Sequence, residues 1–376
     1  MPDNNTFNHP RAMTIALLAF SMSSFAVERA FAQEYLAEAA KIVATATGRQ
    51  AEWTGPTSGP KAQADKLVVY VSADQQNGGV LGVGEGVKEA AKAIGWEFRL
   101  IDGRGTVSGR TAALNQAIAL KPSGIILGSV DAKEIGPGLE LAKQQGITVV
   151  GWHSLAKPGS APEIGIFTNL ATDANDVATA AASYVINESK GKAGVVIYTD
   201  STYDISIVKS NKMKEVIERC GECKVLELVD TPLSDTSARI PPLTTSFLQK
   251  YGEQWTHTLG INDLYFDAAA PALRNAGLSP AGRPRNISAG DGSIAAFQRI
   301  REKQFQAGTV AEPLSLHGWQ AVDELNRAFA GQPPSGFVAP VHLVTPDNIA
   351  DDGGPKNLND PDNGYRDAYR KLWGKN

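Results

Sequence analysis

Short polar side chains follow several apolar segments in the second half of the chain, at positions where buried strands are expected to end. These groups are Asp200-Ser201-Thr202, Asp230-Thr231, Asn262-Asp263 and Asp291-Gly292-Ser293. Their carboxylate, amide and hydroxyl groups accept or donate hydrogen bonds, so they suit recognition of a polar ligand at the carboxyl edge of a sheet. The same residue types are preferred N-caps of helices, and we expect about half of them to act only as caps.

The stretch from Ile147 to Ser154 joins an apolar strand to an indole, an imidazole and a hydroxyl. Trp152 could stack on the C–H face of a ligand while its N–H donates a hydrogen bond, or it could belong to the core. His153 lies at the same strand end, where a histidine often binds only a loop carbonyl. Tyr203 offers another aromatic contact, with packing inside the fold as its alternative role.

Motifs for catalysis are incomplete. Gly82 begins a Gly-x-Gly-x-Gly pattern that resembles a dinucleotide-binding fingerprint, but Val87 replaces the next glycine, and the pattern falls inside an expected helix. No Gly-x-Ser-x-Gly occurs. The carboxylates of Asp291 and Glu312 could supply acid/base catalysis, yet carboxylates also accept hydroxyl groups. We therefore expect a protein without catalytic residues or a cofactor, and an NAD-dependent enzyme is the less favoured alternative.

The two cysteines, Cys220 and Cys223, form a Cys-Gly-Glu-Cys motif where a helix should end and a strand begin. In an oxidising compartment a local disulfide is the favoured interpretation. A thioredoxin-like redox site would need the motif at a helix N-terminus, and a zinc site would need about four ligands. Both remain alternatives, and we expect no metal site.

The composition is that of a globular protein, and the N-terminal segment predicts that the protein is exported. The chain has 376 residues, 42% of them hydrophobic, and a formal net charge of −4, which gives no basic stripe for nucleic acid. Its longest basic cluster, Lys209 to Lys214, is interpreted as one solvated helix face. An apolar run from Met13 to Val27 precedes Ala30-Phe31-Ala32, so residues 1–32 are predicted to be a signal peptide and the mature protein to be soluble in the periplasm.

Strands and helices alternate twice along the chain. Apolar strand-like runs separated by helical patterns predict parallel sheets with helices on both faces, and two such cycles predict two doubly wound α/β lobes. The expected strands are 67–72, 96–101, 124–128, 147–151, 164–167, 193–198, 225–229, 256–261, 285–289 and 305–310. A helical pattern over Glu34–Thr47 and a Pro- and Gly-rich linker precede the first strand.

From Lys66 to about Leu343 the chain resembles the type I periplasmic sugar-binding proteins of ABC importers, in particular the ribose-binding group. The resemblance is carried by Gly124-Ile-Ile-Leu-Gly-Ser-Val-Asp131, Leu259-Gly-Ile-Asn-Asp263, Ser288-Ala-Gly-Asp-Gly292 and Ala307-Gly-Thr-Val-Ala-Glu312. It implies that Asn262 and Asp291 contact the sugar, and that Glu312 replaces a ligand-binding Gln.

The chain departs from that family at two strand ends. His153-Ser154 follows the fourth strand, where ribose binders commonly have an Asp-Arg pair. Gly78-Gly79, preceded by Gln76 and Asn77, stands where they have two Phe. We infer that the stacking surface moves to Trp152, which would give a neutral aromatic wall and suit a sugar alcohol.

The resemblance implies two lobes that close on a sugar or sugar alcohol and deliver it to the membrane permease of an ABC importer. A receptor that feeds a chemotaxis or kinase sensor is the alternative, and a monomer is expected. The expected ligand-binding residues are Gln76, Asn77, Trp152, His153, Tyr203, Arg239, Asn262, Asp291 and Glu312.

The same resemblance implies a hinge with three crossings. They are expected at Thr168-Asn169, Glu312-Pro313 and Ala339-Pro340. The predicted parts of the chain are a signal peptide (1–32), an N-terminal helix and linker (33–65), a first lobe (66–168 plus 313–338), and a second lobe with the tail (169–312 plus 339–376).

Overall fold

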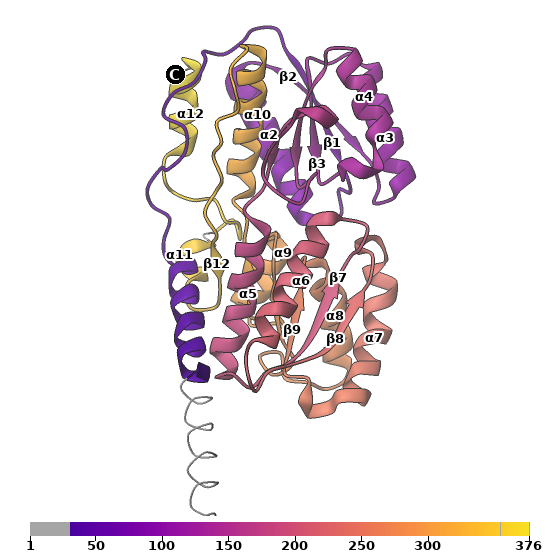
Figure 1. Ribbon diagram of the computed structural model, residues 1–376, viewed down its shortest axis with the longest axis vertical. Helices are drawn as coiled ribbons and strands as arrows, with labels where there is room; N and C mark the ends of the chain where they lie inside the picture. Colours follow the sequence, from indigo (N-terminus) through magenta and orange to yellow (C-terminus); the bar gives the residue numbers. More distant parts are fainter. Residues whose placement is uncertain (1–30, 354, 376) are drawn as a thin grey trace, which may run out of the picture.

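The structure, a computed structural model, describes residues 31–353 and 355–375. It contains two lobes, each built on a six-stranded sheet flanked by helices, and the lobes lie one above the other in Figure 1. The predicted α/β architecture of two doubly wound lobes is confirmed. The predicted signal peptide falls on residues 1–32, of which 1–30 lie outside the described residues.

The first sheet has the strand order β2-β1-β3-β4-β6-β5, and β5 is its antiparallel edge strand. Its strands are β1 Leu67–Ser72, β2 Glu97–Asp102, β3 Gly124–Gly128, β4 Thr148–Trp152, β5 Gly159–Ala161 and β6 Ile166–Leu170. The flanking helices are α2 Gly78–Ile94, α3 Val107–Ala119, α4 Gly136–Gln144 and α10 Leu314–Phe329. Side chains alternate along β1: Val68 and Tyr70 pack with α2 and α10, whereas Val69 and Val71 pack with α3 and α4.

The second sheet has the strand order β12-β11-β10-β9-β7-β8, and β12 is its antiparallel edge strand. Its strands are β7 Gly194–Thr199, β8 Lys224–Asp230, β9 His257–Gly260, β10 Arg285–Ser288, β11 Gly308–Val310 and β12 Leu343–Val344. The helices of this lobe are α5 Ala174–Ser189, α6 Asp204–Glu218, α7 Thr236–Tyr251, α8 Leu264–Asn275, α9 Ile294–Arg301 and α11 Ile349–Asp352. Both antiparallel edge strands are additions to the predicted parallel sheets.

The predicted hinge connections are present, with one displaced. Strand β6 stays in the first sheet as far as Leu170, so that crossing lies in residues 171–173 and not at Thr168-Asn169. The crossing at Glu312-Pro313 joins β11 to α10, and Ala339-Pro340 lies in the segment that leads from α10 to β12.

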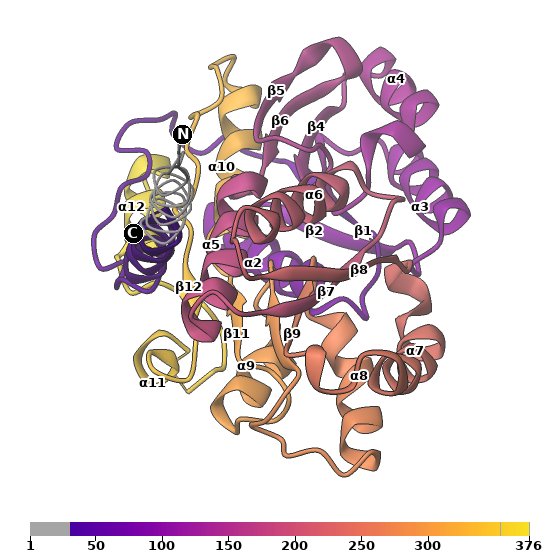
Figure 2. The same cartoon turned by 60° about the horizontal axis from the view of Figure 1, so that its bottom comes forward.

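Each terminal segment packs on the opposite lobe from the residues that adjoin it in sequence. Residues 31–46 are helical and pack on the second lobe, where the Tyr35 hydroxyl donates to the Val216 carbonyl at 2.8 Å. The last helix, α12 Tyr365–Trp373, packs on α10 in the first lobe. The assignment of the whole tail, 339–376, to the second lobe is therefore wrong for α12. Figures 1 and 2 show both terminal helices on the same side of the molecule.

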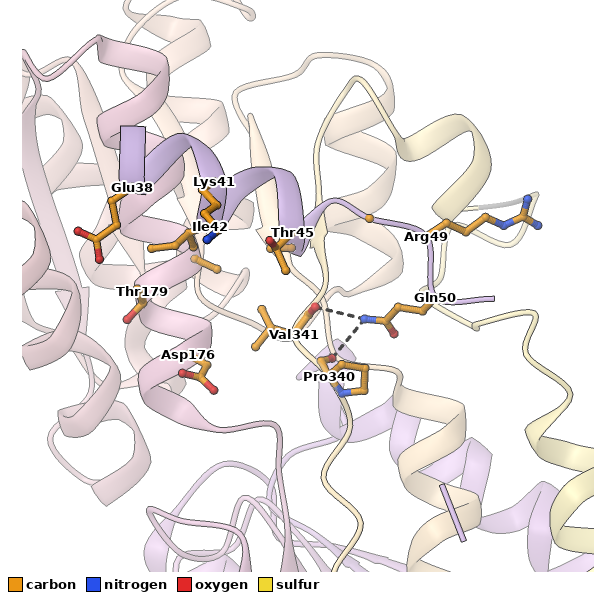
Figure 3. A pocket seen from close by; sticks show the side chains of 13 residues that line it. Glu38, Lys41, Ile42, Thr45, Arg49, Gln50, Asp176, Thr179, Pro340 and Val341 are labelled. Carbon is orange, nitrogen blue, oxygen red and sulfur yellow. Dashed lines mark hydrogen bonds between the residues drawn. The ribbon is translucent and has the colours of Figure 1, made fainter. Parts of the chain in front are cut away.

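A groove of about 830 Å³ lies between the N-terminal helix, α5 and the hinge segment around Pro340 (Figure 3). The Gln50 side chain lines one end of it and donates to the carbonyl of Val341 at 3.2 Å. None of the predicted ligand-binding residues lines this groove. It is part of the connection between the N-terminal segment and the hinge.

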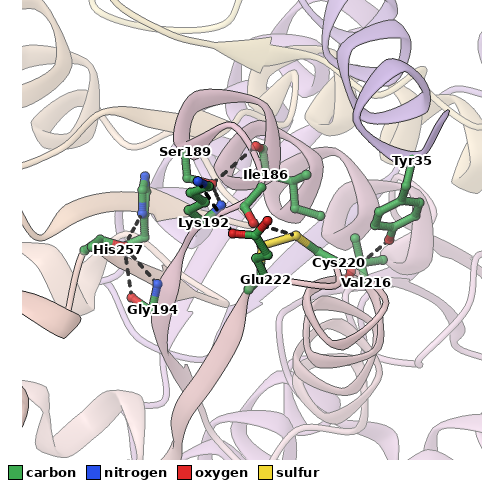
Figure 4. The surroundings of a disulfide bond; sticks show 12 residues. Tyr35, Ile186, Ser189, Lys192, Gly194, Val216, Cys220, Glu222 and His257 are labelled. Atoms are coloured by element: carbon green, nitrogen blue, oxygen red, sulfur yellow. Dashed lines mark hydrogen bonds and ion pairs between the residues drawn. A yellow bond between two sulfur atoms is a disulfide. The ribbon is translucent and has the colours of Figure 1, made fainter. Parts of the chain in front are cut away.

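Cys220 and Cys223 form a disulfide, with their Cα atoms 5.3 Å apart (Figure 4). The bond closes the turn between the end of α6 and the start of β8. The predicted local disulfide is confirmed, and its place after a helix differs from the helix N-terminus that a redox site would need. No helix in the described part of the chain combines the length and apolar character needed to cross a membrane.

Candidate ligand-binding site

The carboxyl ends of the two sheets face each other, and residues from both lobes are in direct contact. The backbone N–H of Asp204 in the second lobe donates to Asp131 Oδ2 of the first lobe at 2.9 Å. Gly79, at the start of α2, lies so close to the Asp291 carboxylate that a Cβ there would overlap it. The absence of a side chain at Gly79 thus allows the lobes to meet, and the lobes are closed on each other.

Asp291 lies between the lobes, where its side chain is buried. Its Oδ2 accepts a hydrogen bond from the Asn262 amide at 2.8 Å, and the Asn262 Oδ1 accepts from the Leu264 N–H at 3.0 Å. Asp263 Oδ2 accepts from the N–H groups of Gly292 and Ser293, which fixes the loop that presents Asp291. Asn262 therefore both accepts from the first N–H of α8 and orients the carboxylate.

Burial raises the pKa of Asp291, and the positive charge of Lys209 and the imidazole of His153 offset only part of this effect. The second carboxylate oxygen of Asp291 has no hydrogen-bond partner among the described residues. A buried carboxylate with an unused acceptor suits the binding of ligand hydroxyl groups, because each hydroxyl can donate to it.

Glu312 lies beside Asp291, and its backbone N–H donates to the Asp291 carbonyl at 3.0 Å. Its Oε1 is 3.0 Å from His153 Nε2, so a residue of the hinge is paired with a residue of the first lobe. Burial by itself would raise the pKa of Glu312, but the imidazole of His153 holds it well below its usual value. Glu312 is therefore ionised in the closed cleft, where it can accept hydrogen bonds.

His317, on the first turn of α10, completes this group and was absent from the predicted set. Its Nδ1 lies 3.1 Å from Glu312 Oε2 and 3.1 Å from the Trp152 indole N–H. One nitrogen cannot donate to the carboxylate and accept from the indole at once, so these two contacts exclude each other. The Trp152 N–H has a buried acceptor only while Nδ1 carries no proton.

Trp152 is completely buried and stacks on His153, with ring centroids 4.0 Å apart and an angle of 12° between the rings. One indole face is thus covered, and the N–H is bound to His317. Trp152 supports the imidazole of His153, which in turn pairs with Glu312. The neutral aromatic wall inferred from the sequence is therefore wrong, because the group at this strand end is an imidazole paired with a carboxylate.

The other predicted residues occupy separate places. Gln76 is exposed at the edge of the cleft and lines the same cavity as Asn262 and Asp291. The Asn77 side chain accepts from the N–H groups of Gly79 and Val80, which is the role of an N-cap of α2. Gln76 therefore lies near the buried group, whereas the side chain of Asn77 serves to cap α2.

Tyr203 and Arg239 lie away from the buried group. The guanidinium of Arg110, which forms a buried salt bridge with Glu134, lies 5.3 Å from the Tyr203 ring centroid. Because Arg110 belongs to the first lobe and Tyr203 to the second, this contact packs the lobes together. Arg239 is exposed on α7 and donates to the Asp230 carbonyl at 3.2 Å. The structure thus brings His153, Asn262, Asp291 and Glu312 together, with Gln76 at the edge.

Lys209 is a member of the buried group that the sequence interpretation missed. Its side chain is only 3% exposed, and a Cβ added at Gly290 would lie 2.9 Å from its Nζ. The ammonium therefore lies against the loop of Asp291, and no salt-bridge or hydrogen-bond partner for it is found within the described residues. The available signal was helical spacing: Lys209 lies three residues after Ser206 and four before Met213, on the buried face of α6, whereas Lys212 and Lys214 do not.

The buried group thus holds two carboxylates, an amide, an imidazole and an ammonium, and it can both donate to and accept from a ligand rich in hydroxyl groups. Across residues 31–353 and 355–375, no cluster of three or more His, Cys, Asp or Glu is arranged to hold a metal ion. The chemistry that this arrangement supports is reversible binding.

Comparisons with known proteins identify the family and the fold. The family model described as a periplasmic binding protein domain matches residues 68–333. A solved structure of the binding protein of the arabinose ABC transporter from Shewanella sp. ANA-3, with bound α- and β-L-arabinofuranose, is 19% identical, with a TM-score of 0.65 over 76% of this chain and 93% of that one. A comparison with curated proteins found no match.

Two further solved structures carry polyols. An ABC transporter solute-binding protein from Agrobacterium vitis with bound allitol is 18% identical, with a TM-score of 0.63 over 76% of this chain and 97% of that one. One from Bacillus halodurans C-125 with bound myo-inositol is 18% identical, with a TM-score of 0.64 over 78% of this chain and 96% of that one.

At these identities the solved structures establish the fold, while the family model covers the chain from β1 to the end of α10. The family consists of binding proteins and not of enzymes, in agreement with the prediction from the incomplete catalytic motifs. The chain therefore belongs to the periplasmic binding protein domain family.

Proposed function

We propose that this protein is the periplasmic solute-binding component of an ABC importer. It captures a sugar or sugar alcohol between its lobes as a monomer and delivers it to a membrane permease. The observation that carries this proposal is the buried group of Asp291, Asn262, Glu312, His153 and Lys209, drawn from both lobes and the hinge. The ligands of structural neighbours, which are arabinofuranose, allitol and myo-inositol, support the same chemical class.

Hinge closure follows from where the polar groups lie. A ligand that contacts His153 on the first lobe and Asp291 on the second binds the closed state better than the open one, and thereby shifts the population toward closure. Each hydroxyl both donates and accepts, and a buried polar group left without a partner costs about 1–3 kcal/mol. That cost selects against ligands that lack a hydroxyl at the right position.

A thermal-shift screen over pentoses, hexoses and alditols, with amino acids as the comparison class, tests the proposal. A ligand that binds only the folded protein at 100 times its Kd stabilises it by about 2.7 kcal/mol, so the cognate ligand is expected to raise the melting temperature clearly. A shift produced by an amino acid and by none of the polyols would show that the ligand class is wrong.

Replacing Lys209 with Met is expected to weaken binding of the ligand found in that screen by about tenfold or more. A hydrogen bond from a charged donor contributes about 1.5–3 kcal/mol, and 1.4 kcal/mol corresponds to a factor of ten. Calorimetric titration measures the change. The matched control is Lys212→Met in the same helix, because Lys212 pairs with Glu215 at 2.9 Å on the outer face and its loss should leave affinity unchanged. Equal affinities for the two variants would remove Lys209 from the site.

A further inference from the structure

A cavity of about 470 Å³ lies beside the buried group, between the first turns of α2 and α10 on one lobe and of α8 and α9 on the other. Asn262 and Asp291 contribute to it from the buried group. Its walls include the apolar side chains of Leu81, Leu264, Ile294 and Leu314. The cavity therefore adjoins the polar site and has a different chemical character.

Two of these apolar side chains are open to solvent at the mouth of the cavity. Ile294 is 57% exposed and Leu81 is 40% exposed. Single exposed apolar residues are common on protein surfaces, but these two come from different lobes and line the same concave space. A ligand held between the lobes could cover both of them at once.

The acidic residues of the cavity already have hydrogen-bond or salt-bridge partners, except for one oxygen of Asp291. Asp263 accepts from the loop N–H groups and from the Gln306 amide, and Asp267 pairs with Arg299. Glu85, on the outer face of α2, lies 3.4 Å from Lys88. The free acceptor is thus the Asp291 carboxylate, and the rest of the wall offers apolar surface to a ligand.

We propose that the ligand is a glycoside whose sugar ring binds Asp291 and Asn262 and whose apolar aglycone lies between Leu81 and Ile294. This inference rests on the proposed function. The volume of the cavity is within the range of about 300–1,000 Å³ that is typical of small-molecule sites. A protein partner is the less suitable occupant, because the polar floor is buried and lies at the end of a concave space.

Calorimetric titration of the full-length mature protein with D-glucose, D-galactose, D-ribose and L-arabinose, each paired with its phenyl glycoside, tests the inference. For the sugar that binds, the phenyl glycoside is expected to bind at least tenfold more tightly. Ile294→Ser and Leu81→Ser are each expected to reduce that preference at least threefold, with the affinity for the free sugar unchanged. Leu141→Ser is the control, because Leu141 is similarly exposed at 39% but lies on α4, away from the cavity.

The outcomes separate this inference from the function on which it rests. If a free sugar binds and its phenyl glycoside binds no more tightly, the aglycone site is overturned and the proposed function stands. The aglycone site is also overturned, and the proposed function also stands, if the phenyl glycoside binds more tightly but neither serine variant reduces that preference. If neither the free sugars nor their glycosides bind, the glycoside proposal is overturned, and the proposed function fails with it only if the thermal-shift screen also finds no alditol that binds.

Discussion

Asp291→Asn is expected to weaken ligand binding by about a hundredfold or more and, at neutral pH, to raise the melting temperature of the ligand-free protein. The loss of affinity follows because an amide cannot accept hydroxyl protons at both terminal atoms, and hydrogen bonds to a charged group contribute about 1.5–3 kcal/mol each. The gain in stability follows because the variant removes a buried charge whose neighbours offset only part of the cost of burial.

The stability effect has a defined dependence on pH. Burial raises the pKa of Asp291 in the folded protein, so the neutral form is favoured there. Such an aspartate stabilises the folded protein at pH values below the pKa of Asp in the unfolded chain, which is about 3.9. This contribution is lost as pH rises through the pKa of the same group in the folded protein. The difference in melting temperature between Asp291→Asn and the parent protein should therefore be larger at pH 8 than at pH 4.

Differential scanning calorimetry at the two pH values and a ligand titration measure both effects. Asp235→Asn is the control, because Asp235 is exposed at the start of α7 and makes no capping hydrogen bond, so it should alter neither quantity. A lower melting temperature for Asp291→Asn at pH 8 would mean that the attraction of the Lys209 charge outweighs the cost of burial. Unchanged affinity would place the ligand elsewhere.

The sequence predicts the lobes and much of the site because the relevant signals are local. A buried parallel strand appears as an apolar run, and the polar residues that follow it must lie at the carboxyl edge of the sheet. Asn262 and Asp291 were selected in this way, His153 was selected at the end of β4, and Glu312 was selected from the family resemblance. Their convergence requires only that the two sheets face each other.

Other features of the site depend on packing that local patterns do not specify. Lys209 belongs to a basic cluster, and only its place on the buried face of α6 separates it from Lys212. Trp152 was expected to present its ring to the ligand, but the side chain turns into the first lobe, where His317 accepts its N–H. His317 itself is contributed by α10, far along the chain, so sequence spacing could not reveal the contact.

The terminal helices show the same limit on a larger scale. An amphipathic helix indicates that one face is buried, but it does not indicate which lobe buries it. The tail was assigned to the second lobe because it follows the third expected hinge crossing, at Ala339-Pro340. Helix α12 instead covers α10, whose residues from Leu314 to Arg327 are all buried.

Trp373→Ala is expected to lower the free energy of unfolding by about 3–5 kcal/mol, which is the usual cost of removing a buried Trp side chain. The Trp373 ring stacks on Trp319 of α10, with centroids 5.4 Å apart and an angle of 4° between the rings. Its N–H donates to Asp323 Oδ1 at 2.8 Å, and burial raises the pKa of that carboxyl. The substitution therefore opens a cavity and removes a hydrogen bond from a buried carboxylate.

A second variant separates the two contributions. Trp373→Phe keeps most of the ring packing but has no N–H, so it should cost only about 1–3 kcal/mol, the price of leaving the Asp323 oxygen without that donor. Urea unfolding measures both variants, with Lys371→Ala on the exposed side of α12 as the control. Because α12 lies on the far side of α10 from the first sheet, ligand affinity should be unchanged in the folded variants. A loss of less than about 1 kcal/mol for Trp373→Ala would mean that α12 is not docked on the first lobe in solution.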